Sequence, residues 1–493
     1  MGSPGVYVRE LDRSLYAPAA APTSVGMVCT ATKGPVGVRT LVTDEESFIN
    51  SFGRPDPNSQ GFYAARQYLR EANILWVVRV GSDIGADPLA VGTLNILDVA
   101  TNLSVQIDTL ENGSFSDTWK IYVTAGTLSG FKIQLYETYG DAEEEFIEEW
   151  DNLTRLTAAD IINDPDTGSS NIEVKAVGTL EPDTAQDPIF FTGGANGFEG
   201  TNIDSKVVAG LLLFEDPELV AIDTLMAPGF SAQAVVLALI TTSSTRKDSV
   251  SLIDPPTGYS ATEVVDWHNG GLGGSILNSS YAALYWPEQI VFDEMNNQEV
   301  IVAPSGFAAA AFARTDRDTA QWWAPAGDPR GKVNSIRTTD APTLGERDLM
   351  YGAGNNVNPI ADLSGIGITI WGQKTLQRAP TALDRLNVRR MVNMIKGIIK
   401  DVSKPFIMDQ NDSFTWSQWK AVVEPPLRDI KAQRGLRDFL VVMDGTTNTE
   451  SLQEQSIMKG KIFLMPQKVA EVIQIDFTIT SQGADFNELL IAG

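Results

Sequence analysis

The chain has 493 residues, of which 37 are Lys or Arg and 63 are Asp or Glu, so its formal net charge is −26. Its 43% of hydrophobic residues is too high for a disordered chain, and its length suits about three globular domains of ~150 residues each. The negative charge argues against nucleic acid or an anionic membrane surface as the main partner, because both attract clustered Lys and Arg.

Cys29 is the only cysteine and His268 the only histidine. An intrachain disulfide, a thiolate metal site and a multi-histidine site are therefore excluded, and a catalytic triad would have to use His268. We expect Cys29 to be a small core residue and His268 to be packed or solvent-facing. Residues 1–5 have no signal-peptide features, and the apolar runs are far shorter than the ~20 residues that span a bilayer. These features predict a soluble protein from a reducing compartment.

The first 22 residues are predicted to form an arm. Val6, Tyr7, Val8 and Arg9 have a short β-strand pattern. Residues 17–22 are Ala and Pro only, which predicts an extended linker because Pro restricts its own φ and the preceding residue. A strand without a nearby partner is either an arm that pairs elsewhere or a frayed or edge strand of its own domain, and this stretch alone does not decide.

Two segments alternate strands with helices. Between residues 23 and 83, strands are predicted at 25–31 and 74–80, with a helix at 59–71. Between 206 and 350, strands and helices are predicted in the order 220–226, 231–241, 249–253, 262–268, 281–286, 300–303 and 306–314. Ser305 is predicted to cap the last helix. This alternation predicts a mostly parallel α/β sheet.

Residues 84–205 differ in charge, with 22 acidic and four basic side chains and a net charge of −18. Alternating stretches at 119–124 and 131–136 predict a β-rich insertion with a solvated surface. The five glutamates of 143–149 are predicted to form a solvated helix face rather than a cation site. Residues 164–168 resemble the start of a calcium loop, but Lys175 stands where the bidentate Glu is needed.

The last third is predicted to contain helices at 384–399 and 427–434 and strands at 439–443 and 473–480. Pro425 and Pro426 are predicted to open the second helix and Gly435 to end it. Residues 371–440 carry 13 basic and seven acidic side chains, opposite in sign to the rest of the chain.

A basic stripe on the second helix is the most informative surface pattern. Three basic residues follow one another at a spacing of three: Arg428, Lys431 and Arg434. One interpretation is a solvated face with Asp429 and Asp438 as local partners. The other is an interface with an acidic protein, favoured by the basic segment and by the aromatic residues of 414–419.

The chemistry of a nucleotide-binding enzyme is absent from the sequence. No phosphate-binding loop motif occurs, and residues 270–274 lack the dinucleotide fingerprint and follow a helix pattern. Ser305 lies between a strand and a helix without the G-x-S-x-G pattern of a nucleophile elbow. We predict no catalytic, cofactor or metal site.

Several stretches, in this order, make the chain resemble the tail sheath proteins of contractile bacteriophage tails: 4–10, 26–28, 32–35, 76–80, 249–256, 303–306, 358–376, 387–390 and 460–477. That family is related to the sheaths of R-type tailocins, extracellular contractile injection systems and type VI secretion. The resemblance covers residues 1–83 and 206–493. The acidic insertion lies outside it and looks like the outer domains that decorate phage sheaths.

The resemblance implies an α/β (α+β multidomain) fold with a mostly parallel sheet in the sheath core, a C-terminal α+β domain and extended arms. The expected domains are an N-terminal arm and linker at 1–22, a core at 23–83 plus 206–350, an outer domain at 84–205, a tube-facing domain at 351–482 and a C-terminal arm at 483–493.

The resemblance implies a structural subunit rather than an enzyme, without cofactor. It would polymerise as stacked hexameric rings around the tail tube and contract to drive the tube through the host envelope, using energy stored in assembly. Its expected partners are other copies of itself, the tail tube protein, and the baseplate and tail terminator proteins, without direct nucleic acid contact or membrane insertion. Its expected location is the virion tail, after assembly in the host bacterial cytoplasm.

The resemblance also implies the contacts. Both arms would add strands to a neighbour's C-terminal domain, Val6 to Arg9 from one end and, from the other, Phe486, Asn487, Glu488, Leu489, Leu490 and Ile491. Arg428, Lys431 and Arg434 would contact an acidic tube surface. The alternatives are an α/β nucleotide- or sugar-binding enzyme and a non-contractile adhesin or capsid-type protein.

Overall fold

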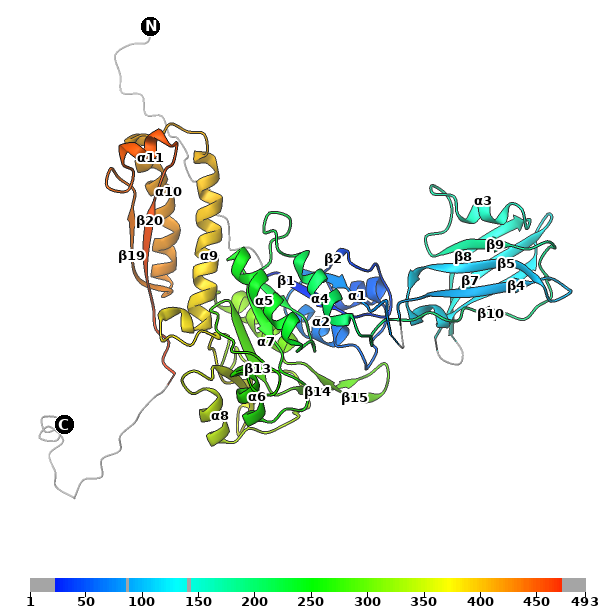
Figure 1. The fold of residues 1–493 in the computed structure, drawn as a ribbon, viewed down its shortest axis with the longest axis horizontal. Coiled ribbons are helices and arrows are strands. Elements are labelled where there is room, and N and C mark those ends of the chain that lie inside the picture. Colours follow the sequence, from blue (N-terminus) through cyan, green and yellow to red (C-terminus); the bar gives the residue numbers. More distant parts are fainter. Residues whose placement is uncertain (1–22, 86–87, 140–142, 472–493) are drawn as a thin grey trace, which may run out of the picture.

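The computed structural model describes residues 23–85, 88–139 and 143–471. The described chain is elongated and consists of three parts in a row (Figure 1). The central unit contains strands β1–β3 and the elements from α4 to β18, and the inserted unit contains β4–β10. The C-terminal unit, from α9 to β20, lies at the opposite end of the molecule from the inserted unit.

The central unit is built on an eight-stranded sheet of order β18-β17-β13-β12-β11-β1-β3-β2. Its strands are β1 Val25–Cys29, β2 Arg39–Val42, β3 Leu75–Arg79, β11 Thr224–Met226, β12 Val250–Ile253, β13 Ala282–Trp286, β17 Val357–Leu363 and β18 Gly367–Ile370. The six inner strands pair in parallel, and only the edge strands β2 and β18 are antiparallel. Every residue of β1, β11, β12 and β13 is buried, as in a sheet covered on both faces. The predicted mixed α/β fold with a mostly parallel sheet is confirmed.

Helices cover both faces of this sheet. The helices of the central unit are α1 Glu45–Phe52, α2 Gly61–Leu69, α4 Ile203–Leu212, α5 Gln233–Arg246, α6 Ala261–His268, α7 Ser305–Asp318 and α8 Leu344–Met350. Met27 and Cys29 of β1 belong to the core formed with α2 and α7, whereas Val28 belongs to the core formed with α4 and α5. Helices α2 and α7 lie so close that a Cβ at Gly306 would come within 2.6 Å of Ala64 Cα.

The strand predicted at 300–303 lies outside the parallel sheet. It is β15 Gln298–Val302, which forms a separate antiparallel sheet with β14 Gln289–Asp293 and β16 Arg337–Thr338. Only four residues separate the end of β14 from the start of β15, which allows a hairpin but not the long crossover that a parallel pair requires.

The inserted unit consists of two antiparallel sheets, of order β4-β5-β9 and β10-β6-β7-β8, that share one hydrophobic core. Its elements are β4 Val91–Leu97, β5 Leu103–Asn112, η1 Ser114–Thr118, β6 Trp119–Ala125, β7 Phe131–Tyr139, β8 Glu143–Leu153, α3 Ala158–Ile162, β9 Ile172–Val177 and β10 Ile189–Phe190. The glutamate run of 143–149 is therefore strand and not the predicted helix face. It pairs with β7, whose long alternating pattern favours a neighbouring strand.

The two ends of the inserted unit lie side by side against the central unit. The backbone N–H of Ser82 donates to the carbonyl oxygen of Gly197 at 2.8 Å, and Ala90 and Ala195 form an antiparallel bridge. The buried guanidinium of Arg79, at the end of β3, donates to the carbonyl oxygen of Asn112 at the end of β5. The insertion is thus fastened at its base by hydrogen bonds from both of its ends.

The C-terminal unit packs two long helices under a two-stranded sheet. Its elements are η2 Ala382–Asp384, α9 Leu386–Ser403, η3 Lys404–Phe406, α10 Ser413–Ala432, β19 Leu436–Val442, α11 Glu450–Glu454 and β20 Lys461–Pro466. Its core is separate from those of the other units. The strand predicted at 473–480 lies outside the described residues, and the predicted domain boundaries remain predictions.

Helix α10 corrects the prediction that a helix begins at the Pro pair. It begins after Asp412, whose side chain accepts from the backbone N–H of Phe414 and Thr415, and it continues through Pro425 and Pro426. The buried apolar residues of α10 recur every three or four positions on both sides of the prolines: Trp416, Trp419, Val423, Leu427 and Ile430. Burial of this apolar stripe offsets the cost of two interior prolines, each about 3 kcal/mol.

Candidate functional site

The sheet of the C-terminal unit has two open edges. Strands β19 and β20 pair antiparallel with each other, and within the described residues neither pairs with a further strand. An open edge presents unpaired N–H and C=O groups, and a two-stranded sheet alone is marginally stable. This sheet is therefore suited to accept additional strands.

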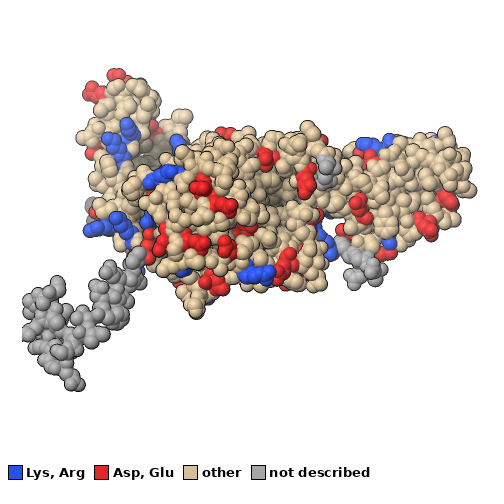
Figure 2. Space-filling view, turned by 60° about the horizontal axis from the view of Figure 1, so that its bottom comes forward, with Lys and Arg blue, Asp and Glu red and all other residues tan. Residues whose placement is uncertain are grey.

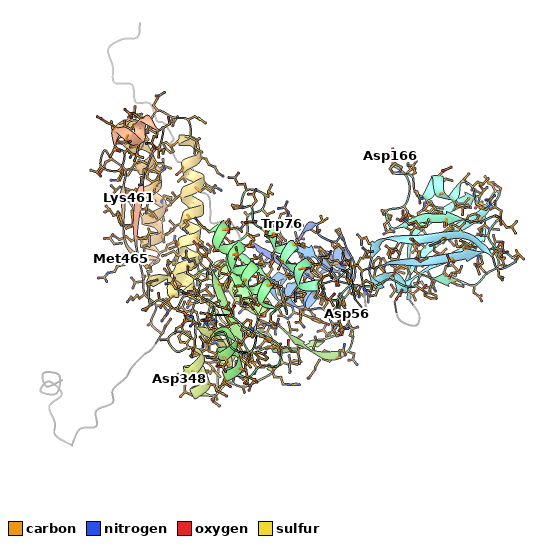
Figure 3. All side chains as sticks on the ribbon, in the orientation of Figure 1. Asp56, Trp76, Asp166, Asp348, Lys461 and Met465 are labelled. Atoms are coloured by element: carbon orange, nitrogen blue, oxygen red, sulfur yellow. The ribbon has the colours of Figure 1, made fainter. Side chains whose placement is uncertain are left out.

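One face of this sheet is anchored and the other is free. Ile462 and Leu464 of β20 pack onto the core formed with α9 and α10. The outer face carries Leu440, Phe463 and Met465, each more than half exposed. Figure 3 shows Lys461 and Met465 of β20 at the outer border of the C-terminal unit. Because Leu440 lies directly opposite Phe463, these residues form one exposed apolar patch.

The patch was not predicted from the sequence. Its signal is the period-2 alternation of 461–466, where Lys461, Phe463 and Met465 alternate with Ile462 and Leu464. Residues Val6 to Arg9 and Phe486 to Ile491, the predicted arm strands, lie outside the described residues.

The predicted basic stripe is only partly formed. Arg428 and Lys431 are exposed on α10, where Arg428 pairs with Glu424 at 2.6 Å and Lys431 with Asp438 at 2.7 Å. Arg434 follows the helix with a left-handed φ of 67°, and its guanidinium carbon lies 5.7 Å from the ring of Trp323. The expectation of three residues on one helical stripe is thus wrong for Arg434, because α10 ends at Ala432.

Charged side chains are distributed unevenly over the molecule. On the face shown in Figure 2, Lys and Arg gather toward the end that carries the C-terminal unit, whereas Asp and Glu are spread over the central and inserted units. Ion pairs at this exposure contribute only about 0–1 kcal/mol each, so Arg428 and Lys431 can exchange their local partners for others at little cost.

A buried ion pair joins the C-terminal unit to the central unit at the point where the described chain begins. Arg390 of α9 donates to the Oδ2 atom of Asp316 of α7 at 2.5 Å, and both side chains are 10% exposed or less. The same oxygen accepts from the hydroxyl of Thr23 at 2.5 Å. The guanidinium also lies 4.4 Å from the ring of Phe312. This contact fixes the base of the predicted N-terminal arm and helix α9 to one residue of the core.

The carboxyl ends of the parallel strands carry no catalytic arrangement among the described residues. Ser305 donates its Oγ–H to Asp254 at 2.6 Å and its backbone N–H to the same carboxylate at 2.9 Å. Burial raises the pKa of Asp254 to about 6. The predicted cap is therefore wrong in its detail: Ser305 is the first residue of α7, and Asp254 supplies the acceptor for its N–H. Neither ring nitrogen of His268 hydrogen-bonds to Ser305.

His268 is packed rather than solvent-facing. It ends α6 and is fully buried, and neither of its ring nitrogens has a hydrogen-bond partner. Burial lowers its pKa to about 4, with a smaller contribution from Arg378. Cys29 is likewise buried in the core, where burial raises the pKa of its thiol to about 12.

The His268 environment predicts a loss of stability in acid. Since the pKa is lowered on folding, the unfolded chain takes up the proton first, and stability falls as the pH drops from 6.5 through 4. At pH 5 the cost is about 2 kcal/mol relative to pH 8. Urea unfolding of the wild type and of His268→Leu at pH 5 and pH 8 measures this loss of stability. Leu has no ring nitrogen to protonate, so the variant should lack this acid-induced loss of stability. Equal pH dependence of the free energy of unfolding in the two proteins would contradict the assignment.

Within residues 23–85, 88–139 and 143–471, no cluster of His, Cys, Asp and Glu has the arrangement of a metal site. No helix in the same ranges is both long and apolar enough to cross a membrane.

Comparison with known proteins places the chain near contractile sheaths. It is 28% identical over 324 residues to the tail sheath protein of Vibrio phage KVP40, covering 61% of this chain and 48% of that protein. It is 29% identical over 333 residues to the tail sheath protein of Enterobacteria phage T4, covering 62% and 50%. The chain thus spans about half the length of these curated relatives. No family model matches it.

Solved structures share the fold at low sequence identity. The contracted helical sheath of the anti-feeding prophage matches with a TM-score of 0.56 and 16% identity over 97% of this chain and 99% of that chain. The sheath tail protein from Desulfitobacterium hafniense matches with a TM-score of 0.62 and 11% identity over 90% and 94%. These findings confirm the resemblance to contractile tail sheath proteins, and the relatives are structural proteins, as expected, and not enzymes.

Proposed function

We propose that this relative of the contractile tail sheath proteins is a self-assembling sheath subunit of a virion tail. The observation that carries the proposal is the open β19–β20 sheet, in a chain whose fold matches contracted sheath subunits over almost its whole length. Subunits assemble in the host bacterial cytoplasm as stacked hexameric rings around a tail tube. The ends of the polymer meet a baseplate and a tail terminator.

The link between subunits is β-augmentation. Val6 to Arg9 of one neighbour and Phe486 to Ile491 of another each add a strand to an open edge of β19–β20. Main-chain hydrogen bonds supply the link, and alternate side chains fix its register. A head-to-tail contact of this kind does not close on itself, so it propagates as a helix. The linker at 17–22 lets the subunits rotate while the strands stay paired.

Contraction releases energy stored during assembly. Subunits repack from a stretched to a contracted arrangement, which drives the tube through the host envelope without nucleotide hydrolysis. Two features support this orientation of the subunit: the C-terminal unit, which carries the exposed Arg428 and Lys431 on α10, lies at one end, and the acidic inserted unit lies at the other (Figure 1). The C-terminal unit faces the tube, and the inserted unit faces outward, where like charge keeps particles apart.

Reversing the charge at the predicted tube contact should prevent assembly on the tube. In Arg428→Glu/Lys431→Glu/Arg434→Glu, each weak contact becomes a repulsion, and its repetition in every subunit multiplies the effect. We expect at least a tenfold loss of tube-bound sheath in co-sedimentation with tube protein. The matched control reverses three exposed basic residues of the central unit, Lys247, Lys332 and Arg337. Undiminished tube binding by the α10 variant would contradict the assignment.

Electron microscopy of the purified, concentrated chain tests the proposal directly. Hollow helical tubes or stacked rings, alone or after addition of tube protein, are the expected result. A monodisperse monomer under both conditions would overturn the sheath function.

A further inference from the structure

The outer face of the four-stranded sheet of the inserted unit is unusually aromatic. Ile121, Val123, Ile133 and Leu135 of β6 and β7 point into the core of the unit. The residues between them point outward, so Tyr122 and Tyr136 lie on the opposite, half-buried face.

Four aromatic rings cross this face from strand to strand. Tyr136 stacks edge-on against Tyr122, with ring centroids 5.3 Å apart, and against Phe146 of β8 at 5.5 Å. Phe146 is 53% exposed although it lies in the middle of a strand. On the far side, Phe190 of β10 is 46% exposed and lies 5.6 Å from the ammonium nitrogen of Lys120. We call these four residues, Tyr122, Tyr136, Phe146 and Phe190, the aromatic row.

Hydrogen-bonding side chains border the aromatic row. The carboxylate of Glu144 accepts from the hydroxyl of Tyr122 at 3.1 Å and from Lys120. Two residues from Tyr136 along β7, the side-chain amide of Gln134 donates to the carboxylate of Glu149 at 2.8 Å. These contacts hold the acceptors in place beside the rings, and each carboxylate retains free lone pairs for a ligand.

The charge of the face excludes an anionic ligand. Its two ammonium groups are already neutralised, Lys120 by Glu144 and Lys132 by Glu149 at 2.8 Å. The segment 84–205 around it has a net charge of −18. A polyanion would meet repulsion here without a cation to offset it.

We propose that the aromatic row binds a neutral oligosaccharide. Pyranose rings have apolar C–H faces that pack on aromatic rings, and hydroxyl groups around their rim that donate to carboxylates and amides. Exposed rings on neighbouring strands can pack against successive sugar units, and Glu144 and Gln134 supply the polar contacts. The inserted unit lies at the end of the molecule away from the C-terminal unit (Figure 1). With the subunit orientation proposed above, on which this point rests, the face stays accessible in the assembled sheath.

Binding of the full chain to immobilised maltohexaose, cellohexaose, mannohexaose and chitohexaose, measured by biolayer interferometry, tests this proposal. We expect at least one to bind with a Kd below about 1 mM. Tyr136→Ala/Phe146→Ala should weaken that binding at least tenfold. Phe146→Ser, which changes only a half-exposed ring, should weaken it in the same direction if the double variant fails to fold.

The matched control is Phe292→Ala, which removes a ring of similar exposure from β14 in the central unit and should bind as the wild type does. The absence of binding to all four sugars, or equal losses in the control and the row variants, would overturn the proposal. Preferential binding of a sulfated polysaccharide such as heparin, or self-association through the row in sedimentation, would overturn it as well. Sheath assembly by the row variants is expected to be unchanged, which separates this site from the assembly surface.

Discussion

A chain that lacks residues 1–22 is expected to fold and yet to form no tubes or rings. The first described strand of the central sheet starts at Val25, and the described residues of its three cores all follow the arm. Without the arm, one open edge of each β19–β20 sheet loses its proposed partner strand, so the links between subunits fail in every copy. Negative-stain electron microscopy and sedimentation at matched concentration measure the loss.

Point variants distinguish the loss of the proposed strand pairing from the loss of chain length. Val6→Pro/Val8→Pro removes two backbone donors from the proposed strand and should abolish assembly as the deletion does. Ala19→Gly/Ala21→Gly changes the linker without touching the strand and should assemble normally. Tubes formed by the deletion at wild-type yield would show that the N-terminal arm does not link the subunits.

Breaking the buried Arg390–Asp316 pair should have the largest effect on the stability of the subunit itself. In Arg390→Met, Asp316 keeps only the Thr23 hydroxyl as a partner in a site that is 10% exposed. Removing one partner of a buried ion pair costs about 3–5 kcal/mol, because the other charge is left uncompensated. The midpoint of urea unfolding, followed by tryptophan fluorescence, should fall accordingly.

A double-mutant cycle shows whether the charge or the volume is responsible. Arg390→Met/Asp316→Leu removes both charges and should recover most of the loss. The exposed pair Arg337–Glu299 provides the comparison, since Arg337→Met should cost less than about 1 kcal/mol. A loss for Arg390→Met no greater than that for Arg337→Met would mean that this contact does not hold the two units together.

Local pattern was sufficient for most of the central unit. The strands β3, β12 and β13 match predicted segments because a strand buried on both faces is apolar at nearly every position. The local sequence pattern gave the wrong structure where contacts with distant residues determine it. The glutamate run of 143–149 is a strand because it pairs with β7. Helix α10 continues through two prolines because its apolar stripe is buried on both sides of them.

The candidate site was predictable only in part. Arg428 and Lys431 lie exposed on a helix, as their spacing indicates, but the position of Arg434 depends on where α10 ends. The contact of Thr23 with Asp316 joins residues 293 positions apart, and no local pattern encodes it. The open edges of β19 and β20 follow from pairings that only the three-dimensional arrangement supplies.

The hydrogen bonds at the base of the inserted unit affect how much the length and sequence of the insertion can vary. The backbone of Ser82 hydrogen-bonds to Gly197, and Ala90 pairs with Ala195. The chain therefore leaves and re-enters the central unit at neighbouring points, as it would at the two ends of a short turn. Lengthening, shortening or replacing what lies beyond that base leaves the spacing between β3 and α4 unchanged and adds little loop-closure entropy. The inserted unit can therefore change in length or sequence while the central unit keeps its own dimensions.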